Sequence, residues 1–389
     1  SDGPGPAVTG IRPTPFSFSD PTRIPPRPWI YGKHLIRGYV ATTIAPGGVG
    51  KSTLTVAEAV AMASGRRLLA DAPHEPLRTW LWNGEDDDDE LRRRVTAAML
   101  RFGVTSEEIG DRLYVDSGRN SPIKIGSIES GKILIATPVV ERLEEVIREN
   151  RIDVVIVDPF VSVHSLPENS NEAMDAAVKT FAGIAHRTRC AFDLVHHSRK
   201  LNGTEADIDA ARGGSAIAAA VRSARVLNPM AAETAKQYGI SPDERRQFVR
   251  IDDAKANLAP VGKAKWFKLV GFPLDNGTDD REGDWVAVPE AWTPPDMMEG
   301  VTSDDLHAVQ RAIHEKGFRE NPQATDWVGF AVANVLDLNA SADPDKHKVK
   351  SLIKAWIASG ALVIGKVRDT RAGRDVSVVE VGKWASSTS

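Results

Sequence analysis

The chain has 389 residues, of which 41% are hydrophobic and 26% are charged, and its formal net charge is −4. This length predicts two or three domains, and this composition is typical of a globular protein rather than a disordered or fibrous one. The small negative charge excludes a strong overall attraction to nucleic acid, so any nucleic-acid site must be a local patch.

The single cysteine, Cys190, excludes a disulfide framework and a cysteine-based metal site, and it is typical of a reducing cytoplasm. The sequence contains no stretch of about 18 apolar residues, which predicts no transmembrane helix. We therefore expect a cytoplasmic protein without a membrane partner.

The first half of the chain alternates strand and helix patterns. Residues 1–29 are dense in proline and predict an irregular arm, and residues 121–137 predict an inserted hairpin. From about residue 30 to residue 198, β-branched apolar runs alternate with amphipathic segments, which predicts an α/β domain with a mainly parallel sheet and helices on both faces. The predicted strands are 38–45, 78–86, 112–118, 153–159 and 190–198, and the predicted helices are 52–65, 87–103, 137–150 and 172–188.

After residue 200 the pattern changes. The polar segment Leu201–Gly214 predicts a loop, residues 215–227 predict a helix or a strand, and two later runs predict strands that close the sheet. Residues 301–385 predict three helices followed by a strand, a turn and a strand, which is the order of a winged helix. The predicted division is an arm at 1–29, an α/β domain at 30–272, a linker at 273–300 and a winged-helix-like domain at 301–385.

The stretch from Ala45 to Ser52 fits the P-loop pattern G-x-x-x-x-G-K-[ST], except that Ala45 replaces the first glycine. A predicted strand precedes it and a predicted helix follows it, which is the context that a phosphate-binding loop needs and a chance glycine-rich turn does not. We expect Lys51 to reach the β- and γ-phosphates of ATP and Ser52 to ligate Mg²⁺. The expected nucleotide-binding residues are Pro46, Gly47, Gly48, Val49, Gly50, Lys51, Ser52 and Thr53.

Two acidic residues stand at the ends of predicted strands. Asp158 ends the buried run "VVIVD", where an aspartate would hold Mg²⁺ opposite Ser52, although it could instead cap the next element. Glu85 ends the strand that follows the P-loop helix, where a carboxylate could orient the water that attacks the γ-phosphate. The alternative for Glu85 is a helix cap or a surface acid.

His196 and His197 end another predicted strand. A histidine pair can hold a metal, but no third ligand is evident and Mg²⁺ prefers oxygen. A γ-phosphate sensor is the favoured interpretation, and a histidine packed near the core is the alternative. Farther along, Arg222, Arg250 and Lys255 are candidates for the cation that a neighbouring subunit inserts into a ring ATPase site, although each could be a surface charge.

These blocks occur in the order seen in RepA-like ATPases, the hexameric replicative helicases of plasmids, phages and mobile elements in the RecA/DnaB-like superfamily. The resemblance covers residues 28–272 and departs from that family in the proline-rich arm, the insertion 121–137 and the C-terminal segment. The blocks are "APGGVGKS", "NGEDDDDELRRR", "VIVDP", "VHHSRK", "ARGGSAIAAAVRSARVL" and "FVRIDDAKANLAP".

The resemblance implies a RecA-like P-loop core that binds ATP and Mg²⁺ and assembles into a homo-oligomeric ring, such as a hexamer. It implies that Glu85 is the catalytic base, Asp158 the Walker-B acid, and His196 or His197 the γ-phosphate sensor. It also implies that Arg222, Arg250 or Lys255 acts in trans, with Arg222 ranked below the other two. The loop Leu201–Gly214 would then face single-stranded DNA in the channel of the ring.

The C-terminal segment has its own basic residues. In a winged helix the third helix enters the major groove and the wing contacts phosphates, so basic residues at both places predict binding to duplex DNA. The alternative is a solvated helix in a protein-interaction domain, because nearby aspartates dilute the charge. The candidates are Lys346, Lys348, Lys350 and Lys354 on the third helix and Arg368, Arg371 and Arg374 around the turn.

The sequence therefore predicts a Mg²⁺-dependent ATPase that acts on DNA, with a ring-forming helicase as the favoured interpretation. One alternative is an ATP-dependent DNA-binding initiator or regulatory switch that does not unwind DNA. A third hypothesis, an adaptor that binds ATP as a structural ligand, is disfavoured because the set Lys51, Ser52, Glu85 and Asp158 is intact.

Overall fold

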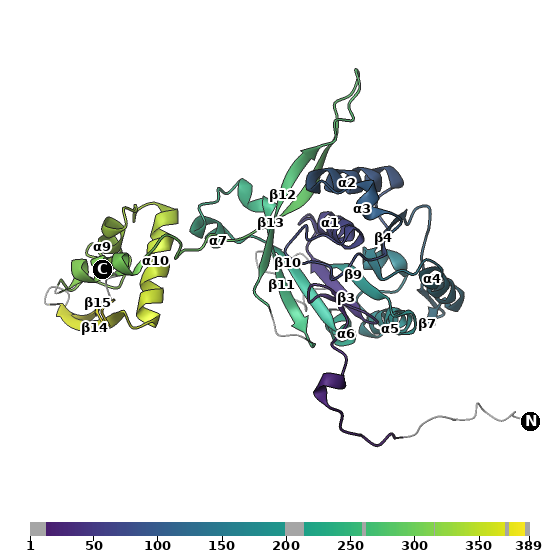
Figure 1. Ribbon diagram of the computed structural model, residues 1–389, viewed down its shortest axis with the longest axis horizontal. Coiled ribbons are helices and arrows are strands. Elements are labelled where there is room, and N and C mark those ends of the chain that lie inside the picture. The colour runs from purple at the N-terminus through teal and green to yellow at the C-terminus, as the bar shows by residue number, and fades with distance from the viewer. Residues whose placement is uncertain (1–12, 199–213, 259–261, 315, 370–372, 386–389) are drawn as a thin grey trace, which may run out of the picture.

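Figure 1 shows the computed structural model of the chain, which describes residues 13–198, 214–258, 262–314, 316–369 and 373–385. A larger α/β body and a smaller C-terminal body lie at opposite ends of the long axis, and the N-terminal arm leaves the α/β body as an extended segment (Figure 1). The arm contains a 3₁₀ turn, η1 (Pro21–Arg23). Among the described residues, no helix is both long enough and apolar enough to cross a membrane.

A nine-stranded sheet forms the centre of the α/β body, in the order β13-β12-β11-β10-β3-β9-β8-β4-β5. The strands from β10 to β5 are parallel to one another, and β11, β12 and β13 extend the sheet as antiparallel strands. This mainly parallel sheet confirms the predicted α/β class. The strands are β3 (Val40–Ala45), β4 (Thr79–Asn83), β5 (Leu113–Ser117), β8 (Val154–Asp158), β9 (Ala191–His197), β10 (Ser223–Pro229), β11 (Phe248–Ala256), β12 (Lys265–Pro273) and β13 (Trp285–Trp292).

Helices cover both faces of the parallel strands. Within β8, Val154 and Ile156 pack into the layer beneath α1 and α2, whereas Val155 and Val157 pack against α4, α5 and α6 on the other face. Because both faces are buried, the strand is a continuous apolar run rather than an alternating one. Figure 1 shows the two layers of helices on opposite sides of the sheet. The helices are α1 (Lys51–Ser64), α2 (Asp88–Phe102), α3 (Ser106–Ile109), α4 (Thr137–Glu149), α5 (Asn171–Thr188) and α6 (Gly214–Ala220), and the 3₁₀ turn η2 is Phe160–Val163.

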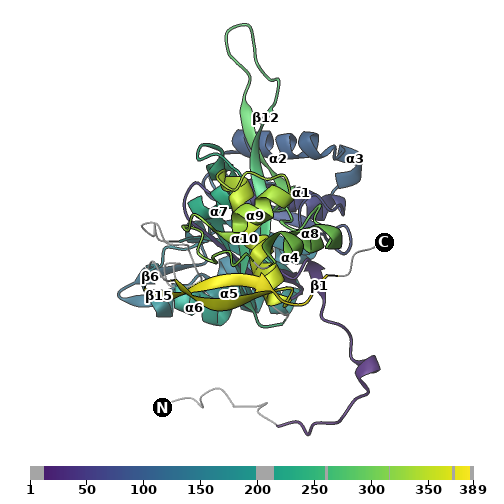
Figure 2. The same ribbon diagram turned by 90° about the vertical axis from the view of Figure 1, so that its left-hand side faces the viewer.

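The expectation of a linker over residues 273–300 is wrong in its middle part. β13 (Trp285–Trp292) pairs antiparallel with residues 266–273 of β12 and forms the edge of the main sheet. Proline, aspartate and glycine on both sides of the short run "WVAVPEAW" hid the strand, and Pro289 is tolerated because an edge strand need not donate every backbone N–H. The tip of this hairpin projects beyond α2 in Figure 2.

Two small hairpins flank the main sheet. The hairpin β6 (Gly126–Glu129) with β7 (Lys132–Ile135) confirms the predicted insertion. The pair β1 (Trp29–Tyr31) and β2 (Leu35–Ile36) was not predicted. Residues 215–227 contain most of α6 as well as most of β10, so the helix and the strand that the pattern left open are both present.

The C-terminal body has its own apolar core, which includes Trp327, Leu352 and Trp356. Its order of three helices and one hairpin is the predicted order. A short extended segment at Arg319 also pairs with Val378 of the hairpin. The elements of the C-terminal body are α8 (Ser303–Ile313), α9 (Val328–Val335), α10 (Asp343–Ala358), β14 (Leu362–Asp369) and β15 (Arg374–Val381). The helix α7 (Ala232–Gln237) and the turn η4 (Glu244–Gln247) belong to the α/β body, and α10 approaches α7.

Candidate active site

The P-loop connects the end of β3 to the start of α1. Gly48 and Gly50 have φ values of +81° and +85°, a left-handed conformation that a side chain would strain. A Cβ placed on Gly48 would have no heavy atom within 4 Å, so the loop borders open space. Gly50 caps α1 without a side-chain hydrogen bond, which leaves the first-turn N–H groups in the arrangement that binds anions.

Asp158 is the last residue of β8 and is 1% exposed. Burial raises the pKa of its carboxyl to about 6, although the Lys51 ammonium and the Ser52 hydroxyl lower it. Its Oδ2 accepts a weak hydrogen bond from Thr55 Oγ1 at 3.5 Å, and its Oδ1 has no hydrogen-bond partner in the part of the chain that the structure describes. A buried carboxylate oxygen without a partner, close to a hydroxyl, is a donor set that fits Mg²⁺.

Glu85 lies in a turn that neighbouring strands hold in place. β4 and β8 are paired so that Asn83 lies opposite Asp158, and the N–H of Gly84 donates to the Asp158 carbonyl at 2.9 Å. The buried Asn83 side chain accepts from the N–H groups of Glu85 at 2.9 Å and Asp86 at 2.8 Å. Asn83 was not predicted, although an asparagine directly before Gly-Glu at a strand end is a recognisable turn pattern.

The two histidines at the end of β9 face different surroundings. His196 is 1% exposed and packs edge-on against Phe160, with ring centroids 6.0 Å apart. His197 is opposite Ala45 in the β3–β9 register, and its Nε2 is 3.8 Å from Glu85 Oε1. The structure therefore brings His197, rather than His196, next to the candidate base.

The three basic candidates lie at opposite ends of the strands β10 and β11. Arg222 directly precedes β10, and Lys255 pairs with Ala224 at the same end, which is opposite to the end of β3 that carries the P-loop. Burial and the Arg222 charge lower the pKa of Lys255. Arg250 lies at the other end of β11, with its Nε 2.7 Å from Asp252 Oδ2 and its guanidinium over Trp266.

A buried ionic network, centred on Arg225 of β10, joins the elements around the site. Its guanidinium donates to both carboxylate oxygens of Glu58 at 2.6 Å and to Thr43 Oγ1 at 2.8 Å, and lies 3.3 Å from Asp193 Oδ2. These partners lie on α1, β3 and β9, the elements that carry Lys51 and His197. Sequence reasoning missed this residue, for which an arginine inside the apolar run "ARVL" was the available sign.

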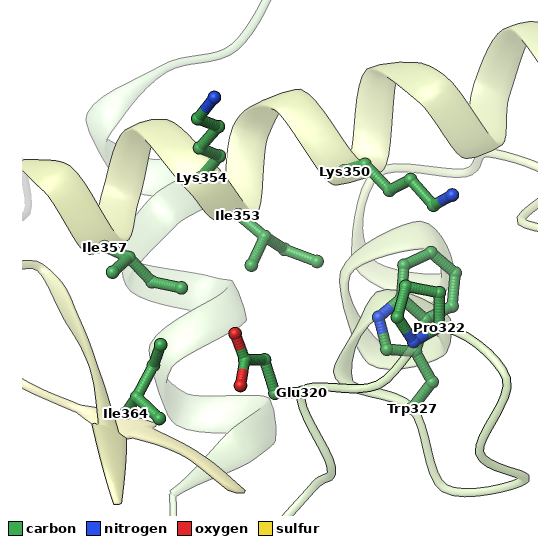
Figure 3. Close-up of a pocket in the computed structure, with 8 residues that line it drawn as sticks. All are labelled: Glu320, Pro322, Trp327, Lys350, Ile353, Lys354, Ile357 and Ile364. Carbon is green, nitrogen blue, oxygen red and sulfur yellow. The ribbon is translucent and has the colours of Figure 1, made fainter. Parts of the chain in front are cut away.

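The candidate DNA-binding residues of the C-terminal body differ in exposure. Lys350 and Lys354 are exposed on α10, whereas Lys346 and Lys348 are partly covered and Lys348 donates to the Glu299 carbonyl at 3.1 Å. Figure 3 shows Lys354 pointing away from an apolar groove of about 340 Å³ that Ile353 and Ile357 line.

The candidates around the turn of the β14–β15 hairpin are described only in part. Arg368 is exposed and lies 3.5 Å from Asp375, and Arg374 is exposed as well. Arg371 and residues 201–213 of the predicted DNA-facing loop lie outside the described residues.

Comparison with known proteins identifies a family and a distant structural match. A family described as AAA domain matches residues 7–203, just over half of the chain, including the P-loop, Glu85, Asp158 and both histidines. Among solved structures, the crystal structure of the RadB recombinase aligns with a TM-score of 0.39 and 13% sequence identity, over 60% of this chain and 88% of that chain. The chain belongs to the AAA domain family and is an ATPase of the P-loop kind.

Proposed function

We propose that this protein is a Mg²⁺-dependent, ring-forming ATPase that acts on DNA as a RepA-like replicative helicase of a plasmid, phage or mobile element. The ATPase part of the proposal is supported chiefly by the convergence of Lys51, Ser52, Asp158 and Glu85, from three separate segments, at the same end of the parallel strands. The helicase part is supported by the resemblance of residues 28–272 to RepA-like ATPases. An adaptor that binds ATP as a structural ligand would not need Glu85 in a turn fixed by Asn83.

Each residue has a role that follows from its position. Lys51, at the start of α1, binds the phosphates, and Ser52 and Asp158 hold Mg²⁺. The bound Mg²⁺ would neutralise charge on the phosphates. Glu85 orients the attacking water, and His197, 3.8 Å from Glu85, senses whether the γ-phosphate is present. His197 lies four residues before the loop Leu201–Gly214, through which we propose that the change reaches DNA.

The trans cations in this proposal are Arg222 and Lys255. Both lie at the end of the sheet opposite their own P-loop, so a role at a nucleotide would require the site of a neighbouring subunit. Arg250 is ranked below them because it is engaged by Asp252 and Trp266. This order differs from the order that the resemblance implied. The strand register groups Arg222 with Lys255 at one end of the sheet, which sequence spacing could not indicate.

The C-terminal body is proposed as a winged-helix domain, residues 301–385, that follows the ATPase domain. The support is its separate core, its order of helices and hairpin, and the exposed lysines Lys350 and Lys354 on α10. Duplex DNA would contact these lysines together with Arg368 and Arg374.

Strand displacement from a forked duplex with a fluorescent strand tests the proposal. We expect displacement that needs MgATP and disappears in Lys51→Ala. Hydrolysis of ATP without displacement would contradict the helicase and would favour the DNA-binding switch.

A subunit-mixing experiment tests the trans cations. Lys51→Ala subunits keep the cation but lack a working P-loop, and Lys255→Ala subunits have the reverse defect. If Lys255 acts in trans, the two inactive variants regain ATPase activity when mixed. The same mixture made with Arg250→Ala is the matched control. Failure of every mixture to regain activity would contradict a shared site.

A further inference from the structure

We propose that the tip of the β12–β13 hairpin of one copy of this chain docks on the C-terminal body of a second copy, with Trp285 in an apolar groove beside α10. The hairpin tip is residues 274–284, and the α10 groove is the cavity of about 340 Å³ that Trp327, Ile353 and Ile364 help to line. The proposal concerns assembly, and its test does not depend on ATP hydrolysis.

The hairpin tip is strongly acidic and stands clear of the α/β body. Its eleven residues include five acidic residues and one arginine, which leaves a formal charge of −4. Asp284 lies 3.1 Å from Arg93, whereas the other four acids are exposed and form no ion pair with a described residue. These four are Asp275, Asp279, Asp280 and Glu282. Figures 1 and 2 both show the tip projecting beyond the body, so its charge is available to a partner.

Trp285 exposes a large apolar surface at the base of this tip. It is 72% exposed, more than any other tryptophan that the structure describes. It pairs with Pro273 where the hairpin closes, and a Cβ on Gly271 would lie 3.2 Å from its ring, so the strand pair holds the indole in place. A tryptophan held in this way can bury its apolar area in a partner with little loss of side-chain entropy.

The α10 groove is the matching apolar surface. Figure 3 shows Ile353, Ile357 and Ile364 along the groove and Trp327 toward its other end. Ile364 is 48% exposed, so this surface meets water unless a partner covers it. Glu320 also lines the groove, and its carboxylate accepts no hydrogen bond from a described residue. An indole has one N–H to donate, so a tryptophan side chain would satisfy both the apolar lining and this acceptor.

The rim of the α10 groove carries the opposite charge to the hairpin tip. Lys350 and Lys354 are exposed one turn apart on α10, and neither forms an ion pair with a described residue. Lys366 is exposed two residues beyond Ile364, on the same face of β14. With Trp285 in the groove, the acids beside it would lie near these lysines, and complementary charges of this kind steer association and fix register. The proposed function assigns two of the same lysines to duplex DNA, so the tip and the duplex would compete for them.

The groove beside α4 is a poorer match for the acidic tip. Its volume is about 460 Å³, and Arg142 is the one basic residue that lines it. That arginine is already paired with Glu145 at 3.0 Å and Glu149 at 3.2 Å, so it offers no free charge to an acidic partner.

The tip and the groove of a single chain lie at different extremities of the molecule. Figure 1 shows the hairpin tip above the α/β body and the C-terminal body at one end of the long axis, so the tip that enters the groove comes from a second copy. Contact between tip and groove joins two different surfaces, and contacts of this heterologous type close into a ring or extend into a filament. A ring is also the assembly of the proposed function, which this contact would help to hold together.

Cysteine cross-linking between copies tests the proposal. The one native cysteine, Cys190, is buried, so introduced thiols have little background. Ala287→Cys places a thiol on the same face of β13 as Trp285, and Gln323→Cys places one next to Pro322 at the groove. The two variants, given tags of different mass, are mixed and treated with a short bis-maleimide, and we expect a covalent heterodimer on a denaturing gel.

The tryptophan and the charges decide the result. Trp285 is exposed, so its replacement should not unfold the protein, and Trp285→Ala in the Ala287→Cys chain should lower the heterodimer yield about tenfold or more. Lys350→Glu/Lys354→Glu in the Gln323→Cys chain should lower the yield as well. Adding Asp275→Lys/Glu282→Lys to the tip should then restore it, because these two acids line one hollow with Trp285 and the exchange makes the charges complementary again.

Glu129→Cys, on the β6–β7 hairpin at the other end of the molecule in Figure 1, replaces Gln323→Cys in the matched control. An equal yield with this control would overturn the proposal, as would an unchanged yield after Trp285→Ala or a charge exchange that restores nothing. A chain that carries both Ala287→Cys and Gln323→Cys and cross-links only within itself would overturn docking between copies.

Discussion

Replacing the buried Arg225 by methionine should lower the free energy of unfolding by about 3–5 kcal/mol. The guanidinium donates to both oxygens of Glu58 at 2.6 Å and lies 3.3 Å from Asp193 Oδ2. The three side chains are 2%, 5% and 2% exposed, so water cannot replace the lost cation. The magnitude comes from the loss of the guanidinium at two buried carboxylates, Glu58 and Asp193, rather than from lost packing; Asp193 keeps His34 at 3.3 Å.

The pKa of Asp193 sets the direction of the pH dependence. Burial raises this pKa, but His34 and Arg225 more than offset burial and hold it at about 2, below the ordinary 3.8. In the native protein this group therefore adds stability above the unfolded value, and the contribution is lost as the pH falls toward about 2. Arg225 is one of the groups that lower the pKa of Asp193. Without it Asp193 binds a proton more readily, so the deficit of the variant should be larger at about pH 8 than at about pH 5.

Urea unfolding of both proteins at each pH measures the effect. Adding Glu58→Leu to Arg225→Met removes one of the two carboxylates that lose the guanidinium. The double variant should recover about half or more of the lost free energy of unfolding. A loss below about 1 kcal/mol, or a deficit that is larger at about pH 5, would refute the reasoning.

Three further predictions test the candidate sites. Asp158→Asn should abolish the Mg²⁺-dependent rise in thermal midpoint that ATP produces. It should not lower the midpoint of the metal-free protein, because the amide replaces a buried carboxylate that has an unpartnered oxygen. A retained Mg²⁺-dependent rise would contradict the role of Asp158 as a Mg²⁺ ligand. Glu85→Gln should bind ATP normally but hydrolyse it about 100-fold more slowly or worse, whereas Asp86→Asn should have a much smaller effect; equal losses in steady-state hydrolysis would argue against Glu85 as the base. The double variant Lys350→Glu/Lys354→Glu should bind duplex DNA of any sequence more weakly, and the slope of log affinity against log salt should fall by about two. Fluorescence anisotropy measures both quantities. An unchanged slope would show that α10 is not part of the DNA-binding surface.

Local patterns predicted the parts of the site that lie within short segments. The P-loop, Asp158 and Glu85 each lie at the end of a recognisable strand, and the parallel arrangement brings these strand ends together. The Arg225 network could not be predicted in this way, because its partners Thr43 and Asp193 come from strands far apart in sequence.

Register decided what spacing left open. Adjacent residues of a strand face opposite sides, so only one of His196 and His197 can face Glu85, but the choice depends on the pairing of β9 with β3. β13 was missed for a different reason: proline and glycine around a short run are the usual marks of a linker, and only the long-range pairing with β12 makes the run a strand.

The most direct measurement is steady-state ATP hydrolysis with Mg²⁺, with and without single-stranded DNA, using Lys51→Ala as the blank. The account predicts hydrolysis that depends on Lys51 and that single strands stimulate strongly, since a motor must couple its catalytic site to the strand it grips. Hydrolysis that is indifferent to single strands would contradict the motor, and hydrolysis that survives Lys51→Ala would contradict the site itself.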